Sequence, residues 1–277
     1  MFDAISRSDR APTRDADLQR VDGAARVVFA PELTELYQRS PCRALLPRVD
    51  GREGAEVVFV NTAGGIAGGD RVRYEMKVSG ATRVTFTTQA AEKIYRALDD
   101  AARIETQVTA SDGALAEWLP QETIVFDGGR FVRSTEIEIY GDSRILALEA
   151  LVLGRAASGE TMRTGEATDR WRVLRDDRLV WADAFRLGGD IAALVERPAL
   201  LDGCRAVATA IYVAPDVADR LDAAREALDD ARAGATVVNS VLVCRMIAPD
   251  SAALRATILR LLTVLRDGAE PPRVWRC

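Results

Sequence analysis

The chain contains no histidine, so any proton transfer or metal binding depends on carboxylates, thiols, lysine, tyrosine or the backbone. Histidine is the most common metal ligand and the side chain best suited to proton transfer near neutral pH. Its absence excludes Ser-His-Asp catalysis, Cys-His catalysis and metal sites built on imidazole. The candidates for chemistry are therefore acids in unusual sequence settings, namely Asp70, Glu92, Glu117, Glu122, Glu149 and Asp183.

Two of these acids occupy sequence positions at which a charged side chain is unexpected. Asp70 closes a glycine-rich turn, where its side chain serves equally well as a partner of the local backbone or as a ligand. Glu149 interrupts the apolar run ILALEALVLG at 145–154. Because a buried carboxylate must be paired, hydrogen-bonded or hydrated, we expect a cationic partner, with Arg155 the first choice.

The remaining chemistry-bearing segments also have ordinary interpretations. Glu92 lies beside Lys93 in the block TTQAAEKIYRA at 87–97, which is typical of a charged surface segment. In the block EWLPQETIVFDGGRF at 117–131, Trp118 is expected to pack in the core at the end of a strand.

The glycine-rich turn connects two strands. The apolar segment VVFVN leads into TAGGIAGGD, which holds Gly64, Gly65, Gly68 and Gly69. A phosphate-binding loop requires a helix after its glycines. Here residues 71–78 alternate polar and apolar side chains, which predicts a half-buried strand. A phosphate site is therefore not expected.

Period-two alternation recurs along the first two-thirds of the chain, for example at 103–108 and 136–139. Short strands separated by Gly, Asp and Ser turns favour a large antiparallel β body. The run at 145–154 fits a buried strand or a helix. Since repeats of fixed length are not visible, a regular propeller or solenoid is not expected from the residues themselves.

The last third predicts two helices around a strand at 240–248. The first begins at Asp216 and ends near Gly234, and the second runs from Asp250 or Ser251 to Gly268. We expect a flexible tail at residues 1–24 and a single domain at 25–277.

Composition indicates a cytoplasmic protein. The net charge is −5, without a basic stripe for nucleic acid, and no apolar run is long enough to span a membrane. The first twenty residues lack the apolar core of a secretory signal. The cysteines are scattered, which fits reduced thiols and neither a disulfide framework nor a zinc site: Cys42, Cys204, Cys244 and Cys277.

Five motifs, in this order, resemble the urease accessory protein UreD family, called UreH in some bacteria: NTAGGIAGGD, TTQAAEKIYRA, EWLPQETIVFDGGRF, LVLGRAASGE and PRVWRC. The similarity covers about residue 25 to the last residue. It implies a mainly β fold, with many strands stacked in a helical β arrangement and two α-helices in the C-terminal third.

The resemblance also implies a role without catalysis. Members bind apo-urease together with UreF and the GTPase UreG and deliver nickel to the urease active site. The implied metal is transient, with no tightly bound cofactor. Matching motifs suggest an internal polar passage lined by Asp70, Glu92, Glu149 and, less securely, Asp183. The other motif residues have structural roles: Gly64, Gly65, Gly68, Gly69, Lys93, Tyr95, Trp118, Pro120 and Gln121.

A histidine-free passage is physically reasonable. Isolated carboxylates hold a hydrated divalent cation weakly, whereas a histidine and cysteine cage would trap nickel. Transfer requires weak binding at several points. Two other classes stay open at this stage: a hydrolase or transferase with a carboxylate pair on a β scaffold, and an interaction scaffold without a metal path.

Overall fold

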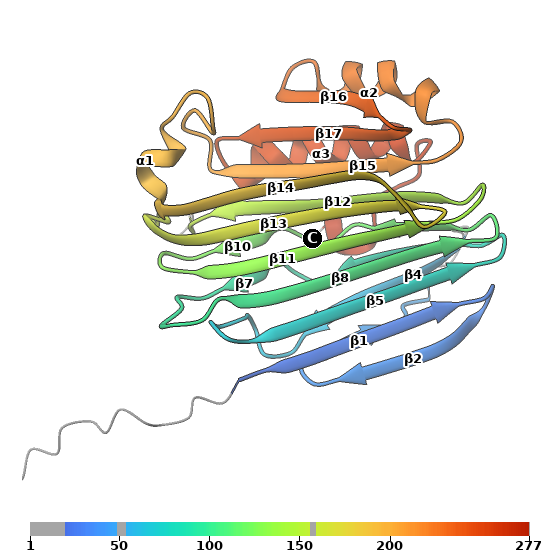
Figure 1. Ribbon diagram of the computed structural model, residues 1–277, viewed down its shortest axis with the longest axis horizontal. Coiled ribbons are helices and arrows are strands. Elements are labelled where there is room, and N and C mark those ends of the chain that lie inside the picture. The colour runs from blue at the N-terminus through green and yellow to red at the C-terminus, as the bar shows by residue number, and fades with distance from the viewer. Residues whose placement is uncertain (1–19, 49–53, 156–158, 277) are drawn as a thin grey trace, which may run out of the picture.

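The computed structural model describes residues 20–48, 54–155 and 159–276 (Figure 1). Within them, a seven-stranded sheet, sheet A, has the order β14-β13-β11-β8-β5-β1-β2. Its strands are β1 (Asp22–Phe29), β2 (Leu33–Arg39), β5 (Arg71–Ser79), β8 (Ala102–Ser111), β11 (Arg130–Ile139), β13 (Thr164–Arg175) and β14 (Arg178–Asp190).

The second sheet, sheet B, has ten strands within the described residues. Its main path has the order β16-β17-β15-β12-β9-β6-β4-β3, and β10 and β7 extend from β12. The strands are β3 (Cys42–Leu45), β4 (Ala55–Asn61), β6 (Arg83–Thr88), β7 (Glu92–Ile94), β9 (Leu115–Trp118), β10 (Thr123–Val125), β12 (Arg144–Leu153), β15 (Ala206–Val213), β16 (Arg232–Val238) and β17 (Val241–Ala248).

In the central part of the fold the chain alternates between the sheets, and neighbouring strands of each sheet are parallel there. In sheet A, β1, β5, β8, β11 and β13 pair in parallel, as β4, β6, β9 and β12 do in sheet B. The result is a β-solenoid of about four turns, as the family resemblance implied. The antiparallel body predicted from alternation is wrong for this central part, as is the expectation that a solenoid is absent.

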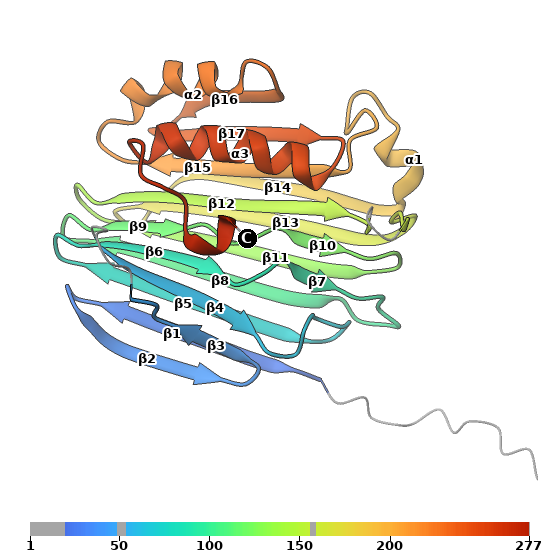
Figure 2. The ribbon, with the colours of Figure 1, turned by 180° about the vertical axis from the view of Figure 1, so that it is seen from behind.

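The middle of sheet B is buried on both faces. Its inner face packs against sheet A through a core that includes Phe59, Phe86 and Ile145. Its outer face packs against helices through residues such as Leu146 and Leu148. Both faces of β12 are therefore apolar, which explains why its sequence alternation was ambiguous between strand and helix. Figure 2 shows α3 lying across β15 and β17 on that outer face.

Within the described residues, two α-helices of at least seven residues lie in the C-terminal third. Helix α3 (Ser251–Leu265) begins at Asp250, whose side chain accepts a hydrogen bond from the Ala253 amide. Helix α2 (Leu221–Leu228) follows the 3₁₀ turn η2 (Val217–Arg220). The predicted end of this helix at Gly234 is wrong, because the chain has already turned into β16 by Arg232. The short helix α1 (Ile191–Val195) follows β14, and the 3₁₀ turn η3 (Arg273–Arg276) ends the described chain.

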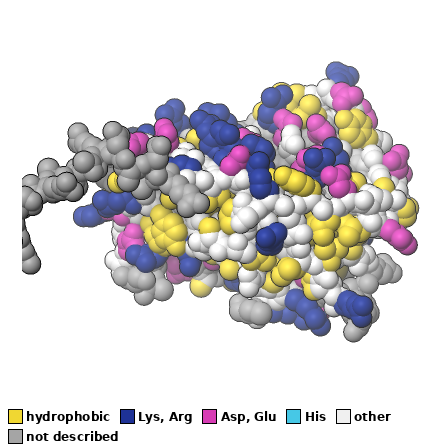
Figure 3. Space-filling model, turned by 90° about the horizontal axis from the view of Figure 1, so that it is seen from below, with side chains coloured by type: hydrophobic (Ala, Val, Ile, Leu, Met, Phe, Trp, Pro, Cys, Tyr) yellow, Lys and Arg dark blue, Asp and Glu magenta, His cyan; other side chains and the backbone are white. Residues whose placement is uncertain are grey.

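The end of the solenoid formed by β1, β2 and β3 carries exposed apolar side chains. Leu33, Leu36 and Tyr37 of β2 are exposed, and Leu45 of β3 is 56% exposed. Hydrophobic side chains gather in patches on this end, among arginine and acidic side chains (Figure 3).

The proposed tail at residues 1–24 falls largely outside the described residues, although β1 already begins at Asp22. The single domain at 25–277 stays a prediction. Cys42, Cys204 and Cys244 are buried free thiols, and Cys277 lies outside the described residues. Among the helices that the structure describes, none is both long and apolar enough to cross a membrane.

Candidate functional site

The glycine-rich turn packs against the segment around β7. The Ile66 amide donates to the Lys93 carbonyl at 2.7 Å, and the Tyr95 hydroxyl donates to the Gly64 carbonyl at 3.0 Å. A Cβ on Gly65 would lie 2.3 Å from the Tyr95 ring, so this contact requires glycine. The first two sequence motifs thus form one packed unit.

The other three motifs join the same unit. Phe126 packs edge-on against Tyr95 with ring centroids 5.1 Å apart, and the Arg155 guanidinium lies over Phe126. Gln121 donates from its side chain to the Val274 carbonyl at 2.9 Å, and Trp275 donates to the Leu119 carbonyl at 3.0 Å. Segments far apart in sequence therefore meet at one edge of the solenoid.

Beneath this edge lies a cavity of about 30 Å³ between the sheets. That volume holds one or two waters. The residues that line it come from both sheets and from the motif segments: Ile66, Tyr74, Thr88, Glu92, Ile104, Thr106, Trp118, Pro120, Gln121, Thr123, Arg133 and Glu149. Two of the four predicted passage acids, Glu92 and Glu149, line this one cavity.

The cavity belongs to a strip of inward-facing polar side chains that we call the polar row. It runs along the solenoid axis, from strand to strand, through an otherwise apolar interior. Register places Tyr74, Thr106 and Thr135 side by side in sheet A, and Glu149, Thr209 and Arg245 side by side in sheet B. The polar row comprises Tyr74, Glu92, Thr106, Thr123, Arg133, Thr135, Glu149, Asp169, Asp183, Thr209 and Arg245.

Arg133 lies at the centre of the polar row and is 1% exposed. Its Nη1 is 2.7 Å from Glu149 Oε2, and its Nε and Nη2 donate to the two carboxylate oxygens of Asp169 at 3.0 and 2.7 Å. The predicted partner of Glu149, Arg155, is wrong. Arg155 instead pairs with Glu160 at the surface.

One guanidinium serves two buried carboxylates, and this imbalance perturbs the pKa of Glu149. Burial, with the neighbouring Asp169 charge, raises the pKa of Glu149 to about 7, although Arg133 and a 2.8 Å hydrogen bond from Trp118 oppose the rise. Burial disfavours the charge on Arg133, yet Asp169 and Glu149 together raise its pKa.

Glu92 is half-buried at the other side of the cavity. Its two carboxylate oxygens accept hydrogen bonds from the Asn61 side chain at 3.2 and 3.1 Å. Burial raises the pKa of Glu92, while the Asn61 amide and the Lys93 backbone amide oppose the rise. The interpretation of Glu92 as an ordinary surface charge is therefore wrong.

The other two predicted passage acids lie away from the cavity. Asp70 is buried and accepts hydrogen bonds from the Val21 and Ala67 amides, both at 2.8 Å, so its carboxylate joins the turn to the residue that precedes β1. Asp183 forms an ion pair with Arg245 across the two sheets, where the polar row reaches solvent.

Two further acids singled out by sequence have structural partners. Glu117 is buried on the helix side of sheet B, where it binds Arg266 at the end of α3 and Arg83. Burial opposes its charge, but Arg266 lowers the pKa of Glu117 overall. Glu122 lies 3.9 Å from Arg255 of α3.

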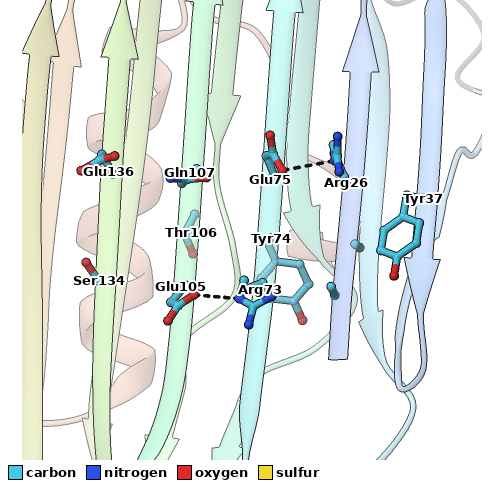
Figure 4. A pocket seen from close by; sticks show the side chains of 12 residues that line it. Arg26, Tyr37, Arg73, Tyr74, Glu75, Glu105, Thr106, Gln107, Ser134 and Glu136 are labelled. Carbon is cyan, nitrogen blue, oxygen red and sulfur yellow. Dashed lines mark hydrogen bonds and ion pairs between the residues drawn. The ribbon is translucent and has the colours of Figure 1, made fainter. Parts of the chain in front are cut away.

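A groove of about 360 Å³ lies on the outward face of sheet A. Its charged side chains already neutralise one another, since Arg73 pairs with Glu105 at 2.8 Å and Arg26 with Glu75 at 3.2 Å (Figure 4). Exposed ion pairs of this kind contribute little energy. The groove is open to solvent and contains none of the predicted passage acids.

Sequence reasoning missed Arg133 and Asp169. Arg133 alternates in phase with Phe131 and Ile137, whose side chains enter the core. The period-two alternation of the strand therefore predicts that the Arg133 side chain points inward. Asp169 has the same phase as Trp171 in β13. Polar side chains at inward positions of a strand are thus the signal in the sequence that identifies both residues.

Comparison with known proteins is consistent along the whole chain. The family model described as UreD urease accessory protein matches residues 21–276. A urease accessory protein UreD from Azorhizobium caulinodans is 41% identical over 268 residues, covering 96% of this chain and 98% of the relative. Proteins of the same name from Xanthobacter autotrophicus and Paracoccus denitrificans are 44% and 40% identical, over 93% and 100% of this chain and 90% and 96% of their own lengths.

Proposed function

The chain belongs to the UreD urease accessory protein family, and from that premise we propose that its polar row conducts nickel toward urease during maturation of the enzyme. A urease accessory protein acts on another protein and needs no catalytic site of its own. The observation that supports the proposal is the strand register, which places polar side chains at neighbouring inward positions of an otherwise apolar core.

The charge of the polar row suits a cationic cargo. Four carboxylates, those of Glu92, Glu149, Asp169 and Asp183, face two guanidiniums, those of Arg133 and Arg245. When all six groups are ionised, the row carries excess negative charge. Excess negative charge in a low-dielectric interior favours entry of a cation over an anion.

The donor set suits passage better than storage. Carboxylate and hydroxyl oxygens are weaker ligands for nickel than nitrogen and sulfur. Among the described residues no group of three or more acids and cysteines is placed to hold a metal ion together. A cation can therefore bind briefly and continue, which is the condition for conduction.

A hydrolase or transferase is disfavoured by size. Small-molecule sites occupy about 300–1,000 Å³, whereas the cavity beside Glu92 and Glu149 measures about 30 Å³. A sugar ring cannot enter it. We propose that a nickel ion moves stepwise instead, exchanging its waters for carboxylate and hydroxyl oxygens, with local motion of side chains.

The partners follow from the same proposal. We expect the chain to bind apo-urease and to work with UreF and the GTPase UreG in the cytoplasm, with nickel as transient cargo and no tightly bound cofactor. Asp183, where the polar row reaches solvent, and Glu92 at the motif edge would receive or release the metal. The alternative, an interaction scaffold without a metal path, predicts that none of the interior acids affects nickel loading of urease.

The direct test is nickel loading of urease in cells that co-express a urease operon. Glu92→Gln and Glu149→Gln should reduce the nickel content of purified urease several-fold at equal amounts of folded accessory protein. Glu138→Gln is the matched control, since Glu138 faces outward from β11. Wild-type nickel content with both interior variants combined would remove the passage from the account.

A further inference from the structure

The Arg133 guanidinium fills the gap between two buried carboxylates. It contacts Glu149 on one side and Asp169 on the other, and its Nη1 also donates to the Thr123 hydroxyl at 3.1 Å. Buried ion pairs are weak sources of stability, because desolvation offsets most of the attraction. The arrangement therefore calls for an explanation beyond holding the strands together.

A second observation points into the same cavity. Thr106 is 1% exposed, and its hydroxyl oxygen has no hydrogen-bond partner among the described residues. It lines the cavity together with Arg133 and Glu149. Buried hydroxyls without a partner are uncommon and indicate a polar occupant such as a water or an ion.

We propose that Glu149, Asp169, Thr106 and Thr123 form a divalent-cation site in which the Arg133 guanidinium occupies the cation position and closes the polar row between transfer events. This inference rests on the proposed passage and identifies Arg133 as its gate, the residue that opens and closes it. All four surrounding groups offer oxygen, the ligand type that binds hydrated divalent cations weakly.

Charge explains why the closed state can open. The single positive charge of Arg133 leaves the negative charge of one of the two carboxylates uncompensated. A divalent cation compensates both. Arrival of the cation therefore offsets the loss of the Arg133 contacts, and the guanidinium returns when the metal moves on. With Arg133 in place, a second cation is repelled.

The gate makes a prediction opposite to that for the passage acids. Removal of the Arg133 charge should convert a weak transit point into a retaining site. Arg133→Gln keeps hydrogen-bonding capacity toward Asp169, and Arg133→Lys keeps a positive charge without the fork that spans both carboxylates. Arg83→Gln is the matched control, because Arg83 pairs with a buried acid, Glu117, outside the cavity.

The experiment is equilibrium dialysis of the purified full-length chain against Ni²⁺ alone. Arg133→Gln should bind Ni²⁺ at least about tenfold more tightly than the wild type, a change typical of altered support around a metal site. Arg133→Lys should show a smaller gain, and Arg83→Gln none. Adding Glu149→Gln to Arg133→Gln should abolish the gain.

Circular dichroism melting with and without Ni²⁺ controls for folding. Folded Arg133 variants that bind Ni²⁺ no better than the wild type would overturn the gate, whatever urease loading shows. Failure of both variants to fold even with Ni²⁺ present would also overturn it, because the metal should replace the missing charge. Tighter binding with normal urease loading by Glu149→Gln would support the cation site and refute the passage.

Discussion

Glu149 controls the charge balance of the interior at the scale of single residues. Its raised pKa means that the folded state binds a proton more tightly than the unfolded chain between about pH 4.5 and 7. The contribution of this group to stability is fully present below the unfolded pKa and is lost as pH rises through the folded pKa. The ionised form, which a cation needs, is therefore the less stable one.

Glu149→Gln should remove this pH dependence. The wild type should lose up to about 3 kcal/mol relative to the variant when pH rises from about 5 to 8. The measurement is the free energy of unfolding in urea at both pH values. Glu138→Gln should follow the wild type. A difference between wild type and Glu149→Gln that is the same at both pH values would show that Glu149 does not titrate in this range.

Gly65 tests the packing of the motif unit that covers the cavity. Its φ of +152° and the nearby Tyr95 ring leave no room for a methyl group. Gly65→Ala should lower the free energy of unfolding by about 2–4 kcal/mol, through strain and overpacking. Gly64→Ala is the control: its φ is +74° and its Cβ would meet open space, so about 1 kcal/mol is expected. Equal losses in denaturant titrations would contradict this packing.

At the scale of elements, α3 was predictable because its start and its buried face each have a separate signal in the sequence. Leu254, Ile258 and Leu261 repeat at helical spacing and are buried against sheet B, and Asp250 caps the start. The end of the preceding helix was not predictable from its glycine. Gly234 lies in β16, an edge strand that pairs with β17.

The cap of α3 gives a measurable prediction. The Asp250 carboxylate accepts from the Ala253 amide at 2.8 Å, so Asp250→Ala should cost about 1 kcal/mol of unfolding free energy. Asp222→Ala, a change at an exposed acid of α2, should cost little. The comparison is made by thermal melting of both variants. Destabilisation by Asp222→Ala equal to that by Asp250→Ala would contradict the role of the cap.

Strands were predictable but their neighbours were not. Alternation at Val72, Tyr74 and Met76 correctly marked the face that enters the core. The same pattern carries no information on whether the adjacent strand runs parallel or antiparallel, since side-chain direction depends on one strand alone. Only the family resemblance supplied the stacked arrangement.

At the scale of the whole molecule, unequal turn lengths hide the repeat. Side chains that meet in adjacent turns are separated by 29 positions for Thr109 and Glu138 but by 36 for Arg133 and Asp169. A search for a fixed period therefore finds nothing, although each turn repeats the same path. Arg133 and Glu149 lie on β11 and β12, which belong to opposite sheets, so the alternation within either strand does not reveal that they pair.

The solenoid aligns single polar residues from successive turns into one row. Each strand that contributes to the polar row supplies only one or two of its side chains, such as Thr106 from β8 and Thr135 from β11. No single segment contains a recognisable site. The function that we propose is thus a property of stacking, and it is tested best by obstruction of the row without removal of any charge.

Thr106→Leu provides that obstruction. The larger apolar side chain should fill the cavity and remove an unpartnered hydroxyl, so the chain should fold at least as stably as the wild type. Val108→Leu is the matched control, since it enlarges an apolar inward position on the same strand. The measurement is the nickel content of urease purified from cells that co-express each variant. Our account predicts nickel-poor urease with folded Thr106→Leu and nickel loading in proportion to protein abundance with Val108→Leu, whereas full loading with Thr106→Leu would contradict passage through the interior.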